Sequence, residues 1–274
     1  MTLREVPAAS LAERAWEFQS PHLHLILQSV AAGNTAACAW TLDPGDPARL
    51  CVLWELGNKG LWVMGHDTTA EGIAALAAAA AGALPERARA LGLRRLAVRG
   101  VGPGMHACVE HAFAGRLTGA CTVVFHHLPP GSTAPVASPP CGVDLVPVNG
   151  RLLAGGQANA DAVAAEVRWM WPSLERYLGH GWGVAAVAHG EVVGWCTAEF
   201  VGPERCSVCL ETVEKRRRQG IGTGAGSRLV ALSLARGRTP CWECDAANLP
   251  SLRLAARLGF VPCQSEPQLL GTWE

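Results

Sequence analysis

The spacing of apolar and polar residues in the second half of the chain predicts alternating strands and helices. Short apolar runs between Gly, Pro and polar residues are typical of strands, and longer amphipathic runs are typical of helices. The expected strands are 143–148, 182–188, 191–200, 206–213 and 240–245. The expected helical segments are 155–178 with a break near Trp171-Pro172, 222–235, and 251–258 ending at Gly259. The order β-α-α-β-β-β-α-β-α is typical of an α/β fold, with a central mixed sheet flanked by helices.

The first half of the chain has a weaker pattern with a similar order of elements. The expected helical segments are 21–32, 69–91 with a break at Pro85, and 105–113. The expected strands are 36–42, 50–55, 60–65, 94–98 and 121–127. The order of elements from 36 to 127 is three strands, a helix, a strand, a helix and a strand. This order repeats that of the later part of the second half. The similarity is one of topology, because the two halves show no convincing residue-level repeat.

A proline-rich segment separates the two halves. Residues 129–140 read PPGSTAPVASPP, and five prolines with Ser, Thr and Gly exclude a helix or a central strand. We therefore expect an N-terminal domain at 1–128, a linker at 129–140 and a C-terminal domain at 141–274.

Composition narrows the class of protein. Hydrophobic residues make up 49% of the 274 residues and charged residues 17%, which is enough apolar material for a substantial core. The formal net charge is zero, which argues against nucleic-acid or membrane-surface partners. The first twenty residues lack an apolar signal core, so we expect a cytoplasmic protein. The eleven cysteines are then expected to be reduced.

A basic, glycine-rich turn is the most informative motif. The run Arg217-Arg218-Gln219-Gly220-Ile221-Gly222 follows the expected strand 206–213 and opens the expected helix 222–235. Glycines let backbone N–H groups approach phosphate oxygens, the helix N-terminus carries partial positive charge, and arginines add full charge. The turn therefore predicts a pyrophosphate site.

A second motif downstream makes the pattern specific. Asn248, Ser251, Leu254 and the run Leu258-Gly259-Phe260 follow the turn by about thirty residues. Together the two motifs make 206–262 resemble the GNAT superfamily of acyl-CoA N-acyltransferases. The run 239–244 followed by Asn248 also resembles a bacterial two-half subgroup, which implies a tandem GNAT-like architecture with a degenerate first half.

The resemblance implies acetyl-CoA as cosubstrate and assigns its contacts. Backbone amides of 218–222, with Thr223, would hold the pyrophosphate, and 210–212 would pair with the pantetheine arm as an added strand does. Asn248 and Ser251 would contact the arm or the phosphate end. The cofactor residues implied in this way are Leu210, Glu211, Thr212, Arg217, Arg218, Gln219, Gly220, Ile221, Gly222, Thr223, Asn248 and Ser251.

The catalytic residues are less well defined. Many family members carry a general-acid Tyr on the last helix, where this chain has Ala255, and no motif places the single tyrosine, Tyr177, in the site. For the general base we consider Glu204, which precedes the strand before the turn, and Glu211, which lies within it. By alternation Glu211 faces away from Cys206, Val208 and Leu210 unless a bulge intervenes. The alternative is that both are solvated or structural carboxylates.

Two further patterns are expected to carry no chemistry. The pairs Cys206/Cys209 and Cys241/Cys244 have zinc-ligand spacing, but residues three apart in a strand face opposite sides, so we expect no metal. In the first half, the segment Met64–Thr69 stands where the basic turn would be. It has one glycine, no arginine and Asp67, which would repel phosphate. One CoA site per chain is therefore expected, in the second half.

The sequence thus predicts an N-acetyltransferase that transfers an acetyl group to a primary amine of a small molecule or peptide. The amine would attack the thioester directly in a ternary complex, because no cysteine has a nucleophile setting with His and a carboxylate. We expect a monomer or homodimer that binds neither nucleic acid nor membranes. The alternative is a CoA-binding sensor or interaction module that has lost catalysis.

Overall fold

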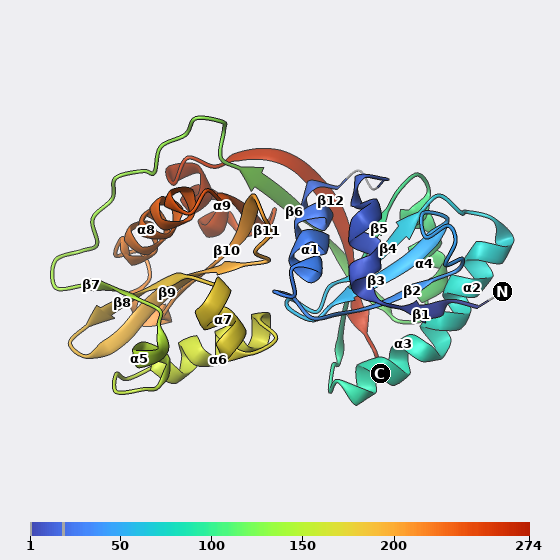
Figure 1. Ribbon diagram of the computed structural model, residues 1–274, viewed down its shortest axis with the longest axis horizontal. Helices are drawn as coiled ribbons and strands as arrows, with labels where there is room; N and C mark the ends of the chain where they lie inside the picture. Colours follow the sequence, from blue (N-terminus) through green and yellow to red (C-terminus); the bar gives the residue numbers. More distant parts are fainter. Residues whose placement is uncertain (1, 18–19) are drawn as a thin grey trace. The chain divides into compact units, whose positions relative to one another are not determined.

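The computed structural model describes residues 2–17 and 20–274 of the chain (Figure 1). The chain divides into two compact units. The first comprises Met1–Ala31, Thr35–Val123 and Glu266–Glu274, and the second comprises Ala32–Asn34 and Val124–Ser265. These bounds differ from the expected 1–128 and 141–274 mainly because the last nine residues pack with the first unit.

The first unit contains the elements that the sequence pattern predicts, with two additions at its start. Its elements are β1 (Arg4–Val6), the 3-10 helix η1 (Ala8–Glu17), α1 (Pro21–Ala31), β2 (Ala37–Thr41), β3 (Leu50–Glu55), β4 (Leu61–Gly65), α2 (Ala70–Ala81), α3 (Ala83–Ala90), β5 (Arg95–Val101), α4 (Met105–Phe113) and β6 (Leu117–His127), the last shared with the second unit. The helical segment expected at 69–91 breaks at Gly82, so the prediction of a break at Pro85 was wrong. Pro85 lies in the first turn of α3, where a missing N–H costs no helical hydrogen bond.

The second unit follows its predicted order, with two short helical turns and a last strand in addition. Its elements are β7 (Asp144–Pro147), α5 (Gly150–Leu153), α6 (Ala160–Met170), α7 (Leu174–His180), β8 (Gly183–Ala188), β9 (Glu191–Glu199), β10 (Arg205–Thr212), the 3-10 turn η2 (Glu214–Arg216), α8 (Ile221–Ala235), β11 (Thr239–Asp245), α9 (Leu249–Arg257) and β12 (Val261–Thr272), the last shared with the first unit. The hairpin turn between β8 and β9 is confirmed, because His189 and Gly190 both have positive φ, as a two-residue hairpin requires.

The fold class is mixed α/β, as predicted. The strands form one twelve-stranded mixed sheet in the order β1-β2-β3-β4-β5-β12-β6-β11-β10-β9-β8-β7. Within each unit, four strands pair antiparallel before a parallel pair, β4 with β5 in the first and β10 with β11 in the second. The two units therefore repeat one topology, as the sequence rhythm indicated.

Glycines bring α8 close to β10 in the second unit. A Cβ added to Gly222 would lie 3.2 Å from Leu210 Cδ2, and one added to Gly226 would lie 3.3 Å from Leu210 Cδ1. Gly222 and Gly226 are one helical turn apart, so Leu210 packs into the groove that they leave. This contact holds the first turn of α8 beside β10.

The proline-rich segment also packs on α8. As expected, residues 129–140 contain neither helix nor strand. The Ser227 hydroxyl accepts a hydrogen bond from the Ala137 N–H at 3.2 Å and donates one to the Pro135 carbonyl. The segment is therefore fixed along the helix by backbone contacts within the second unit.

A buried hydroxyl joins α8 to the residue that precedes β8, and it supports a stability prediction. Ser233 Oγ accepts a hydrogen bond from Trp182 Nε1 at 2.9 Å and donates to the Leu229 carbonyl at 2.9 Å.

Ser233→Ala should lower the free energy of unfolding by about 1–3 kcal/mol, because the buried indole N–H loses its acceptor. In urea unfolding, Ser233→Ala in a Trp182→Phe background should cost less than in the parent. If Ser233→Ala lowered the free energy of unfolding equally in the parent and in the Trp182→Phe background, the assigned hydrogen bond would be contradicted.

Candidate functional site

The turn before α8 presents backbone N–H groups in a conformation suited to an anion. Arg218 and Gly220 have φ of 61° and 87°, and helix α8 begins at the next residue, Ile221. Alternation with left-handed residues directs successive N–H groups to one side. No side chain caps this end of α8, and its first turn contains no acidic residue. An anion can therefore occupy the helix N-terminus.

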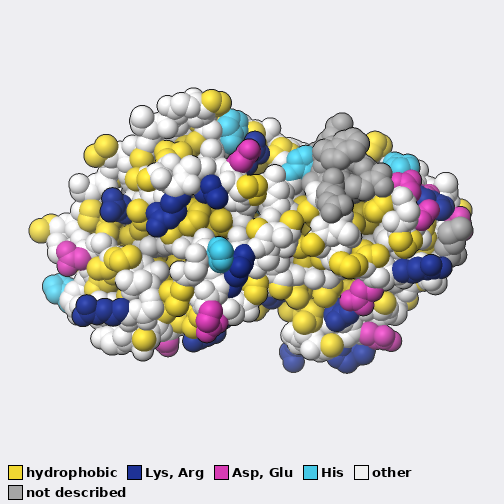
Figure 2. All heavy atoms as spheres, viewed as in Figure 1, with side chains coloured by type: hydrophobic (Ala, Val, Ile, Leu, Met, Phe, Trp, Pro, Cys, Tyr) yellow, Lys and Arg dark blue, Asp and Glu magenta, His cyan; other side chains and the backbone are white. Residues whose placement is uncertain are grey.

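Basic side chains are concentrated around this turn, at positions 215–218. Arg217 forms an ion pair with Glu211 at 3.1 Å, and Lys215 forms one with Glu191 at 3.3 Å. Arg216 and Arg218 form no ion pair within the described part of the chain, and Arg218 is exposed. Figure 2 shows Lys and Arg side chains gathered over the region of α8 on the viewed face.

Several residues assigned to the cofactor have structural contacts of their own. Ile221 is 2% exposed and packs in the core between β8, β9 and α8, so only its backbone can reach a ligand. Gln219 donates to the Lys215 carbonyl at 3.4 Å. Asn248 Oδ1 caps α9 by accepting the Ser251 N–H at 3.2 Å, and Ser251 Oγ accepts from Trp242 Nε1 at 3.0 Å. Thr223, in the first turn of α8, is partly buried.

Strand β10 has an unpaired edge beside this turn. It pairs with β11 only through Arg205–Ser207, opposite Thr239–Cys241. Its remaining residues, through Thr212, pair with β9 but have no ladder partner on the β11 side. An extended ligand arm can use such an edge as an added strand does. The opening spans Leu210, Glu211 and Thr212, which the sequence assigned to the pantetheine arm.

Strand alternation places the two predicted carboxylates differently. Glu204 is exposed in the turn before β10, where its carbonyl accepts the Thr239 N–H at 2.8 Å. Glu211 lies within β10 on the face opposite Leu210, as alternation predicted, and its exposed carboxylate pairs with Arg217. Glu204 therefore lies outside the strand, and only Glu211 lies within the segment assigned to the pantetheine arm.

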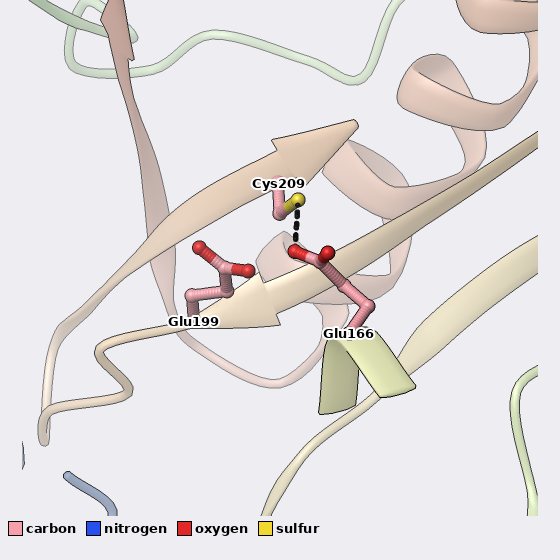
Figure 3. A group of neighbouring side chains, drawn as sticks. All are labelled: Glu166, Glu199 and Cys209. Carbon is pink, nitrogen blue, oxygen red and sulfur yellow. Dashed lines mark hydrogen bonds between the residues drawn. The ribbon is translucent and has the colours of Figure 1, made fainter. Parts of the chain in front are cut away.

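A polar cluster that the sequence did not indicate lies on the face of β10 that carries Glu211, opposite Leu210. Glu199 at the end of β9, Cys209 on β10 and Glu166 on α6 bring one donor atom each to within 4.8 Å of one another (Figure 3). The Cys209 thiol donates to Glu166 Oε1 at 2.9 Å. Burial and the charges of Glu199 and Glu166 raise the pKa of the Cys209 thiol well above its ordinary value. The two neighbouring carboxylates can pair with a positively charged group.

The two cysteines of the first CxxC pair lie on opposite faces, as alternation requires. Cys206 packs against α8, with its thiol 3.7 Å from Ser233 Oγ, and burial raises its pKa to about 12. Cys209 instead faces α6. The two thiols are therefore not placed to share one metal ion.

The first unit lacks both features of this site. The Asp67 carboxylate lies at the N-terminus of α2, where it accepts the Thr69 N–H at 2.9 Å and the Arg49 Nε–H at 2.7 Å. Burial opposes ionisation, but these hydrogen bonds from Thr69 and Arg49 hold the pKa of Asp67 below its usual value. Strand β4 pairs with β5 from Leu61 to Met64, nearly its whole length. An anion at α2 would meet a carboxylate, and β4 leaves almost no open edge on the β5 side.

Comparison with known proteins agrees with this geometry. Residues 140–265 match the family model described as GNAT acetyltransferase. The C-terminal half belongs to the GNAT acetyltransferase family. A curated relative, the uncharacterized N-acetyltransferase YdfB of Bacillus subtilis (strain 168), is 34% identical over 90 residues. That segment covers 33% of this chain and 34% of the relative, so the chain matches about a third of the relative's length.

Solved GNAT structures resemble the whole chain. A GCN5-related N-acetyltransferase-like protein from Streptococcus suis 89/1591 aligns with a TM-score of 0.64 at 14% identity, covering 97% of this chain and 99% of that chain. A tandem GNAT protein from the clavulanic acid biosynthesis pathway aligns with a TM-score of 0.59 at 16% identity, covering 99% of both chains. At these identities the likeness is one of fold, and that fold is a tandem GNAT architecture. No helix in the described part of the chain has the length and apolar character that crossing a bilayer requires.

The raised pKa of Cys209 in the GNAT half gives a prediction on thiol reactivity. At pH 8 the thiolate that reacts with iodoacetamide should be scarce at Cys209 and Cys206, whereas Cys141 is exposed. Peptide mass spectrometry of the native protein should show Cys141 modified first and Cys209 protected, with both modified equally in urea. Equal rates in the native state would contradict the assigned environment of Cys209.

Proposed function

We propose that the GNAT half is an acetyl-CoA-dependent N-acetyltransferase that acts on a primary amine of a small molecule or peptide. The observation that carries the proposal is the uncapped N-terminus of α8, which lies beside the unpaired edge of β10. The first feature suits a pyrophosphate and the second suits an amide-bearing arm. Coenzyme A has both groups, joined in this order.

The cofactor would be held mostly by backbone. Amides of 218–222 would bind the pyrophosphate, with Thr223 and the Arg217 and Arg218 side chains adding contacts. The β10 backbone at Leu210–Thr212 would pair with the pantetheine arm. Asn248 and Ser251 would support its far side from the start of α9. Gly220 would let the backbone approach the phosphates. Its left-handed φ of 87° suits glycine, and a side chain there would meet the phosphates.

The reaction would proceed in a ternary complex without an acyl-enzyme. The amine nitrogen would attack the thioester carbonyl, which backbone N–H groups polarise, and the CoA thiolate would leave. Cys196, Cys206 and Cys209 are unsuited to be nucleophiles, because burial raises the pKa of each thiol. Glu204 and Glu211 remain the base candidates suggested by sequence. Of these two, the position of Glu211 within β10 favours it.

One observation favours a second function, a CoA-binding module without catalysis. Ala255, which stands where many family members carry a general-acid Tyr, is fully buried in the core of α8, α9 and β11. Purified protein, acetyl-CoA and a panel of amines separate the two functions when thiol release is followed. Release with any amine supports the transferase, and CoA binding without release across the panel supports the module. The unit would work in the cytoplasm as a monomer or homodimer.

The site assignment predicts a selective loss of CoA affinity. Gly220 and Gly237 lie at the two ends of α8, both with positive φ, and a Cβ at either meets no closer neighbour than 3.9 Å. Gly220→Leu should weaken CoA binding at least about tenfold, since the side chain blocks the approach of the phosphates. Gly237→Leu is the matched control, because it carries similar backbone strain, of roughly 1–2 kcal/mol, far from the turn.

Isothermal titration calorimetry measures both affinities, and urea unfolding measures both stabilities. Similar losses of stability with a loss of affinity only in Gly220→Leu are expected. Unchanged affinity in Gly220→Leu would place the CoA site elsewhere. Equal losses of affinity in both variants would show that backbone strain, not contact with the ligand, controls binding.

A further inference from the structure

The polar cluster of Glu166, Glu199 and Cys209 lies next to the proposed reaction centre. Cys209 is the second residue after the point where β10 separates from β11. Cross-strand pairing places Glu199 opposite Ser207 and Thr197 opposite Cys209, so all four side chains lie on one face of the sheet. Helix α6 adds Glu166 on this face. The cluster therefore borders the open edge that would hold the thioester arm.

The cluster concentrates negative charge in a place with little water. Glu199 is 5% exposed, and its carboxylate, that of Glu166 and the Cys209 sulfur lie within 4.8 Å of one another. Figure 3 shows the two carboxylates directed toward each other, from β9 and from α6. Carboxylate oxygens this close repel each other, and a cation between them offsets that repulsion.

A buried hydroxyl on the same face lacks a hydrogen-bond partner. Tyr177 on α7 is 1% exposed, and its hydroxyl has no partner within the described structure. It points at the sheet beside Thr197: a Cβ added to Gly183 would lie 2.7 Å from Tyr177 Oη and 2.9 Å from Thr197 Cγ2. It also interacts electrostatically with Glu199. An unpaired buried hydroxyl is costly, which indicates that a polar ligand group completes the site.

A second buried donor on this face also has an N–H group without a hydrogen-bond partner in the described structure. Trp195 on β9 is 7% exposed, and its Nε1–H also lacks a partner within the described structure. Trp195 and Glu199 flank Thr197 along the strand, so both side chains lie on the face of Cys209. The face thus combines carboxylates, which accept hydrogen bonds, with two unused N–H and O–H donors.

We propose that Glu166 and Glu199 bind the ammonium group of a cationic acceptor and that Glu199, in place of Glu204 or Glu211, removes its proton. This proposal deepens the proposed N-acetyltransferase function and rests on it. The substrate class is a primary amine without a carboxylate beside the amino group, such as an amino alcohol, whose oxygen can pair with the Tyr177 hydroxyl or the Trp195 N–H. An α-amino acid would bring its own carboxylate against the acidic pair.

The proton and bond changes balance in this scheme. The ammonium gives one proton to the Glu199 carboxylate, which later releases it to solvent. The neutral amine forms the N–C bond to the thioester carbonyl, the C–S bond breaks, and CoA leaves as thiolate. The second proton of the nitrogen neutralises that thiolate, leaving an amide and free CoA thiol. Cys209 acts as a positioning residue, because its thiol proton holds Glu166 toward the acceptor.

The test compares Glu199→Gln and Glu166→Gln with Asp161→Asn, which removes an exposed carboxylate from the same helix, α6. Ethanolamine and glycine serve as probes with the full-length protein. Both glutamine variants should lower kcat/KM for ethanolamine at least about a hundredfold while the dissociation constant of CoA changes less than about twofold. Asp161→Asn should behave as the parent, and the parent should prefer ethanolamine to glycine.

Direct binding covers the case of undetectable turnover. With CoA bound, calorimetric titration should show ethanolamine binding to the parent and no binding to either glutamine variant. Two further variants test the positioning role of Cys209. Cys209→Ser should have a lower KM for ethanolamine than Cys209→Val, because only serine keeps a donor for Glu166.

Three results would overturn the proposal. The first is that both glutamine variants keep kcat/KM or amine affinity within about threefold of the parent. The second is that the parent binds CoA but no cationic amine. The third is that the purified parent holds one equivalent of metal, which is lost only when this cluster is mutated. Loss of CoA binding in the parent is a different failure, because it would remove the N-acetyltransferase function itself.

Discussion

Helix α8 can present its first turn at the edge of β10 only because glycines occupy the contact between them. Leu210 fills the space left by Gly222 and Gly226, and a Cβ on Gly226 would come within 2.6 Å of Leu258 Cδ1. A bulkier helix would stand away from the strand, and its N–H groups would no longer adjoin the unpaired β10 backbone. The glycines of the motif thus divide their roles, since Gly220 shapes the turn while Gly222 sets the helix–strand distance.

The two units share one topology but differ at the helix N-terminus and the strand edge that follow their antiparallel strands. In the first unit the end of α2 is satisfied by Asp67 and Thr69, and β4 keeps its pairing with β5. In the second unit the corresponding helix end is uncapped and the corresponding strand pair separates after three residues. In the first unit, a side-chain carboxylate and a continuous ladder thus occupy both positions. An uncapped helix end and an open ladder in the second unit are the features on which the proposed CoA site rests.

Local patterns allowed most of this fold to be predicted. The His189-Gly190 turn fixed a hairpin, and the alternation in 206–213 correctly set Cys209 and Glu211 apart from Leu210. Strand β12 escaped prediction because Pro262 and Pro267 interrupt its alternation, and its pairing with β5 depends on residues far away in sequence. The cluster of Glu166, Glu199 and Cys209 escaped for a related reason. It depends on the register that sets Ser207 opposite Glu199, which no short motif reveals.

The proposed CoA site combines one helix end and one open strand edge, both in the GNAT half. Both features are made of backbone N–H groups, so amide hydrogen exchange with and without CoA reports on them. CoA should slow exchange in 208–212 and 218–223 and leave exchange in 65–72, at the start of α2, unchanged. Protection at 65–72, or none at 218–223, would contradict it.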